Sequence, residues 1–197
     1  MTIYEPMTLA TDYIVALATA IFAVLAWQRG ARLWAFMFAF TAAGSFLGGT
    51  YHGTENLLWW KPAVYAIGLA SFFLLLAVTP NRTIHALALV QFMVYATWMI
   101  GHDSFLWVIV DYGISLIIVL SMQLFAWVRE HAASAPWLVG SVVVSAIAAG
   151  VQQVPSRWHN DVYHIVQLGS LWLMYRGAMV MSAGNAMTEQ PAITNAR

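Results

Sequence analysis

Seven apolar stretches, each long enough to cross a membrane as a helix, follow one another through this chain. A helix needs about 20 residues to span the hydrocarbon core of a bilayer. The expected spans are residues 9–27, 33–53, 59–78, 83–100, 104–127, 135–154 and 160–182. Short polar turns between them make successive helices antiparallel neighbours. The sequence therefore predicts an all-α bundle of seven transmembrane helices over residues 1–186, followed by a polar tail at 187–197.

Composition supports a membrane protein and excludes several other classes. Of the 197 residues, 61% are hydrophobic and 8% are charged, against about 25% charged in soluble domains. The formal net charge is zero, so we expect membrane lipids rather than nucleic acid as partners. Cysteine is absent, which excludes disulfides, thiolate metal ligands and a cysteine nucleophile. The only lysine, Lys61, stands at a helix start, which excludes a retinal Schiff base in the middle of the bundle.

Basic residues gather on one side of the predicted membrane. The turns after the first, third and fifth spans and the C-terminal end hold six arginines, whereas the opposite side has Lys61 and Arg157. By the positive-inside rule, this distribution places the N-terminus outside and the C-terminus in the cytoplasm. We expect an integral membrane protein with this orientation, and we assign it to the bacterial inner (cell) membrane.

Costly polar side chains gather in one layer on the outer side. Ionisable groups inside a membrane are expensive, so each is a functional hypothesis. Late in the second span stand Ser45 and His52, and about 10 Å deep in the fifth stands Asp111. The start of the seventh span holds His159, Asn160, Asp161 and His164. Ser45 and His52 share a helix face with Gly48 and Gly49, where another helix can approach closely.

Three of these residues form a predicted metal site. His52 and His164 supply ring nitrogens and Asp161 supplies a carboxylate oxygen, a set suited to zinc. Asp111 is the alternative source of this oxygen. If Asp161 is the ligand, Asp111 would act catalytically as the proton acceptor for a metal-activated water. The alternative is a structural polar network in which Asp and His side chains of neighbouring helices only hydrogen-bond each other.

Two stretches resemble the CREST superfamily, which includes the alkaline ceramidases and the progestin and adipoQ receptors. They are residues 45–52, with a serine and a histidine, and residues 159–164, with two histidines. The resemblance implies a seven-helix fold with its N-terminus outside, a zinc ion held by histidines, and hydrolysis of a lipid amide assisted by a serine, here Ser45. The chain departs from the family pattern, because Gly48 stands four residues before His52, and Asn160 four before His164.

The leading hypothesis is a zinc-dependent membrane hydrolase acting on a lipid-like amide or ester in an outward-facing polar pocket. A second hypothesis is a small proton-coupled transporter, which needs a polar route to the cytoplasm. The third is a sensor or assembly protein without catalysis, whose polar layer only fixes the packing of the helices.

Overall fold

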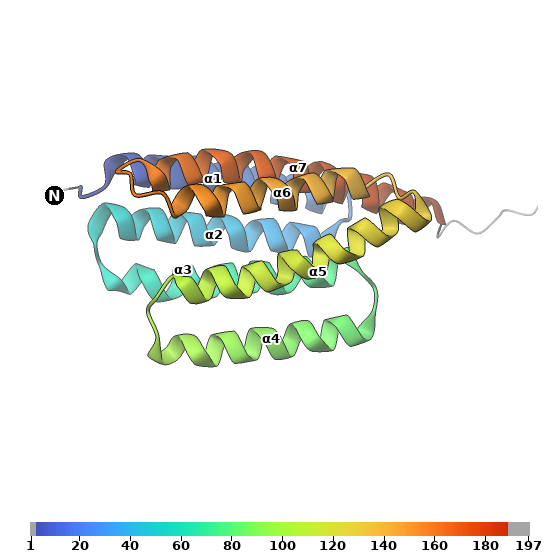
Figure 1. The fold of residues 1–197 in the computed structure, drawn as a ribbon, viewed down its shortest axis with the longest axis horizontal. Helices are drawn as coiled ribbons and strands as arrows, with labels where there is room; N and C mark the ends of the chain where they lie inside the picture. The colour runs from blue at the N-terminus through green and yellow to red at the C-terminus, as the bar shows by residue number, and fades with distance from the viewer. Residues whose placement is uncertain (1–2, 189–197) are drawn as a thin grey trace, which may run out of the picture.

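The computed structural model describes residues 3–188, which form seven helices and no strand (Figure 1). The helices are α1 (Pro6–Gln28), α2 (Arg32–Thr54), α3 (Leu57–Val78), α4 (Arg82–Gly101), α5 (Leu106–Glu130), α6 (Ala135–Gln152) and α7 (His159–Thr188). The predicted all-α, seven-helix architecture is confirmed. The largest difference is at the end of α7, which continues beyond the expected residue 182. Residues 189–197 of the predicted polar tail lie outside the described residues.

Six of these helices, α1 to α6, are long and apolar enough to cross a membrane. The seventh, α7, is longer but begins with a polar stretch that contains His159, Asn160, Asp161 and His164. Proline marks several helix starts, as at Pro6 in α1 and Pro136 in α6, where a missing amide proton leaves no helical bond unmade. Asn81 caps α4 by accepting hydrogen bonds from the amides of Thr83 and Ile84.

Six helices form a closed ring, and α4 lies outside it. Around the ring, α1 packs on α2, α2 on α3, α3 on α5, α5 on α6, α6 on α7, and α7 back on α1. The helix α4 packs on α3 and, over a smaller area, on α5. Figure 1 shows α4 apart at one edge, and α5 crossing the bundle obliquely from the side of α3 to the side of α6.

The two ends of the ring differ in packing. The turns α1–α2, α3–α4 and α5–α6 lie at one end, which we call the packed end, together with the last turns of α7. Its core is apolar and well buried: Phe38, Leu74, Val119, Leu138 and Met174 are each 0% exposed. The opposite end, with the N-terminus and the turns α2–α3, α4–α5 and α6–α7, carries the polar residues. We call it the cavity end.

Candidate functional site

A cavity of about 690 Å³ lies inside the ring and reaches the cavity end. All six helices of the ring contribute to its lining, whereas no residue of α4 does. Pockets of a few hundred to a thousand Å³ are the size that holds small ligands. The ring therefore encloses a space large enough for a small molecule, and the packed end closes this space on the side opposite the cavity end.

The lining of this cavity is most polar at one end, and Thr41, Ser145 and Gln167 add a few polar groups farther in. Polar and titratable side chains come from the first turns of α1 and α7 and the last turns of α2: Asp12, Ser45, Tyr51, His52, Asn160, Tyr163 and His164. Toward the packed end the lining becomes apolar, with Leu116, Leu120, Val142 and Leu171. An amphiphile, with a polar group and a hydrocarbon part, matches this division.

The central contact of the polar end is a pair formed by Asp12 of α1 and His164 of α7. Nε2 of His164 lies 3.2 Å from Oδ1 of Asp12, and Nδ1 of the same ring lies 2.9 Å from the hydroxyl of Thr11. The Asp12 side chain is only 8% exposed, yet it lines the cavity. A carboxylate buried in a membrane protein needs such a partner, and the pair is placed to exchange protons with a ligand.

Two glycines of α2 make room for this carboxylate. A Cβ atom added at Gly49 would lie 2.8 Å from Cβ of Asp12 and 3.0 Å from the ring of Tyr13. At Gly48 the nearest atom would be Oδ2 of Asp12, at 3.9 Å. The predicted close approach on the face shared by Ser45, Gly48, Gly49 and His52 is therefore made by α1 at Gly49, while the other three residues line the cavity.

A second acid–base pair joins His52 to Glu5. Nδ1 of His52 lies 2.9 Å from Oε2 of Glu5. The segment before α1 runs along the end of α2, because the amides of Tyr4 and Glu5 donate to the carbonyls of Gly53 and His52, each at 3.3 Å. A carboxylate on one ring nitrogen orients an imidazole and sets its tautomer, which leaves the other nitrogen for acid–base chemistry.

The remaining predicted site residues have other partners. Asp161 is 7% exposed, and its Oδ1 accepts a hydrogen bond of 3.0 Å from Thr8. Asp111 does not line the cavity; its Oδ1 accepts a bond of 2.9 Å from Gln91 of α4. The amide of Gln91 also reaches the Ser115 hydroxyl at 2.9 Å. Asp111 therefore belongs to a network that holds α4 against the ring.

The proposed zinc ligands His52, His164 and Asp161 are not arranged around one point. No group of three His, Asp or Glu side chains in the described part of the chain could hold a metal ion. Both nitrogens of His164 are already engaged, by Asp12 and Thr11, and Asp161 is bonded to Thr8. The residues present therefore do not fit the predicted zinc set as they stand.

Sequence reasoning missed Asp12 and Glu5. The signal for Asp12 was available, because it is the only charged residue between residues 6 and 28, a stretch otherwise suited to span a membrane. Its partners could not be inferred, since nothing in the sequence says that α1 and α7 are neighbours. Glu5 precedes the apolar stretch, a position typical of a residue at the membrane interface, so its contact with His52 could not be predicted from the sequence.

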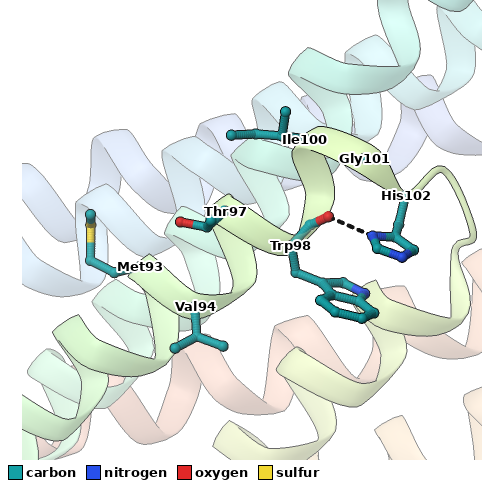
Figure 2. A pocket seen from close by; sticks show the side chains of 7 residues that line it. All are labelled: Met93, Val94, Thr97, Trp98, Ile100, Gly101 and His102. Atoms are coloured by element: carbon teal, nitrogen blue, oxygen red, sulfur yellow. Dashed lines mark hydrogen bonds between the residues drawn. The ribbon is translucent and has the colours of Figure 1, made fainter.

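A second pocket, of about 710 Å³, lies at the surface of α4 and is separate from this site (Figure 2). In it the ring of His102 stacks on that of Trp98 with centroids 3.9 Å apart, and Nδ1 of His102 donates to the carbonyl oxygen of Trp98 at 2.8 Å. Lys61, in the same region, pairs with Asp103 at 2.6 Å. These partners lie in the last turn of α4 and in the turn that follows it, so His102 and Lys61 have structural roles there.

Comparison with known proteins identifies a family but no individual protein or solved structure that matches. The family described as "Family of unknown function (DUF6962)" matches residues 7–183, which contain every residue that lines the cavity. Searches of curated proteins and of solved structures gave no match. The resemblance to the CREST superfamily stays a prediction.

Proposed function

Since the chain belongs to the DUF6962 family, whose function is unknown, we propose from its cavity that it is a membrane hydrolase of lipid-like amides or esters. The single observation that carries the proposal is the pair of acid–base centres at the polar end of an otherwise apolar cavity within the helix ring. A polar site buried between apolar spans is costly to maintain, and such sites in membrane proteins are mostly functional.

The arrangement supports hydrolysis by general acid and general base. In the proposed reaction, the Asp12 carboxylate takes a proton from a water molecule, whose oxygen attacks the carbonyl carbon of the substrate. His52, oriented by Glu5, gives a proton to the departing nitrogen or oxygen, so that an acid and an amine or alcohol are released. His164 donates to Asp12 from Nε2 and holds the carboxylate in place.

The cavity also offers a donor for the carbonyl oxygen. Trp60 of α3 lines it, and its indole Nε1 is buried without a hydrogen-bond partner among the described residues. An unsatisfied buried donor is uncommon and favours a ligand that supplies an acceptor. In the proposed reaction this N–H group stabilises the negative charge that develops on the carbonyl oxygen.

No step of this mechanism passes through a metal ion, since the predicted zinc ligands do not converge. Zinc stays a prediction, and metal analysis of protein purified without chelators tests it. The transporter hypothesis finds less support, because the cavity ends on Leu120, Val142 and Leu171, and the buried polar residues Gln123 and Ser141 farther toward the packed end do not line it. We propose the predicted orientation as well, with the N-terminus outside, so that the cavity serves the outer half of the bacterial inner membrane.

The test compares two buried aspartates of similar exposure. Asp12→Asn keeps an acceptor for His164 but removes the base, so hydrolysis should fall by at least about 100-fold, the range of general base catalysis. Asp111→Asn keeps an acceptor for Gln91 and should leave the rate unchanged. Product release from N-acyl amides and acyl esters in nanodiscs, followed by mass spectrometry, measures both. Equal rates for Asp12→Asn and the native protein would contradict the proposal.

A further inference from the structure

The cavity has an opening between α5 and α6, on the side of the bundle that faces lipid. Ile117 of α5 and Ala146 of α6 both line the cavity and are both exposed, Ile117 to 65%. A side chain can do both only where the wall of the cavity is interrupted. The interruption lies in the first half of α5 and the second half of α6, which belong to the cavity end.

Small residues keep this opening free. Gly113 of α5 and Ala149 of α6 also line the cavity, and a Cβ atom added at Gly113 would meet no atom within 4 Å. The path of α5 agrees with such an opening: α5 contacts both α3 and α6, and Figure 1 shows it running obliquely from the side of α3 to the side of α6. We call the set Ile109, Gly113, Ile117, Ala146 and Ala149 the lateral window.

The surroundings of the lateral window determine what can pass through it. Both helices are apolar and long enough to span a membrane, so hydrocarbon covers their outward faces. Along α5 the window extends over nine residues, from Ile109 to Ile117, and the eight steps between them span about 12 Å at the rise of an α-helix. Its residues are apolar, whereas the polar residues Asp12, His52 and His164 come from other helices of the ring, α1, α2 and α7.

We propose that a single-chain lipid of the outer leaflet enters through the lateral window and keeps its hydrocarbon chain between α5 and α6. Its polar group then lies at Asp12, His52 and His164. The volume of about 690 Å³ suits one such molecule rather than a lipid with two full chains. This inference deepens the proposed function, since it names the class of substrate for the same site.

The absence of native cysteine allows a test that does not depend on hydrolysis or on the identity of the polar group. Ser45 lines the cavity, and Ser45→Cys adds a single thiol there with little change in size. The protein in nanodiscs is treated with N-dodecylmaleimide, which dissolves in the bilayer, or with a sulfonated maleimide, which stays in water. Mass spectrometry gives the labelling rate for each reagent.

Two matched substitutions decide the route. Gly113→Trp fills the lateral window and should slow labelling by N-dodecylmaleimide at least tenfold. Gly150→Trp should leave that rate unchanged, because Gly150 does not line the cavity and its Cβ would also meet no atom within 4 Å. Ala149→Trp, from the opposite side of the window, repeats the test should Gly113→Trp fail to fold.

Each result has a definite meaning. Unchanged labelling by N-dodecylmaleimide in folded Gly113→Trp or Ala149→Trp protein would overturn the lateral window, as would a thiol at residue 45 that only the sulfonated reagent reaches. If the native protein hydrolyses none of the amides and esters tested, while Gly113→Trp still slows labelling by N-dodecylmaleimide, the proposed reaction is overturned. The route for the lipid is then still supported.

Discussion

The contact between α1 and α2 at Gly49 gives a sharp prediction about stability. In Gly49→Ala the new methyl carbon would lie 2.8 Å from Cβ of Asp12 and 3.0 Å from the ring of Tyr13. Carbon atoms pack best at about 3.5–4.0 Å, so the two helices must separate by about 1 Å. Cβ of Asp12 is fixed to the backbone and cannot turn away. Overpacking of this kind costs about 1–3 kcal/mol.

Two other glycines provide the controls for this prediction. At Gly150 an added Cβ meets nothing within 4 Å, and alanine is favoured over glycine in a helix by about 1 kcal/mol. Gly150→Ala should therefore be neutral or stabilising. Gly48→Ala should also keep its stability, since its nearest neighbour would lie at 3.9 Å. Reversible unfolding in mixed micelles measures the free energy of unfolding of all three. Equal stability of Gly49→Ala and Gly150→Ala would refute the reasoning.

Four further predictions concern the polar contacts. Gln91→Leu removes the donor to the buried Asp111 carboxylate and should lower the free energy of unfolding by about 1–3 kcal/mol in the same micelle assay. Ser170→Ala removes hydroxyl contacts between α6 and α7 at 2.7 and 2.8 Å; it should cost only about 0.6 kcal/mol, the mean for such bonds in membranes. Glu5→Gln should slow hydrolysis about tenfold in the nanodisc assay, whereas Glu55→Gln, at an exposed position, should not. Chelator treatment should leave that hydrolysis unchanged, and stoichiometric zinc with loss of activity on its removal would contradict the metal-free mechanism.

Hydrophobic patterning was sufficient to predict the seven helices, because long apolar runs broken by short turns leave few other ways to satisfy the backbone in lipid. The ends of the helices followed from prolines and polar turns. The position of α4 outside the ring could not be predicted from the sequence, since short turns at both of its ends fit a helix on either side of α3. Which helices touch depends on the side chains of every helix at once.

For the candidate site, the sequence allows an estimate of depth but gives no information on direction. Counting residues at 1.5 Å each gives the depth of a side chain in the bilayer, and by that measure His52, Asp111 and His164 belong to one layer. The direction of each side chain depends on which helices are neighbours. In the structure, His52 and His164 face the cavity, whereas Asp111 faces α4 through Gln91. The same rule of depth, applied to the first span, would have added Asp12.

The contacts that form the site also close the ring. The helices α1 and α7 are joined by Thr8 to Asp161, Thr11 to His164 and Asp12 to His164, three polar contacts between the two ends of the chain. Polar contacts between helices are a main source of specificity in a membrane, where lipid tails compete for every apolar face. A loss of activity on changing His164 can therefore arise from an opened ring as well as from lost chemistry. Asp12→Asn separates the two, because the amide oxygen preserves the contact with His164 while the base is removed.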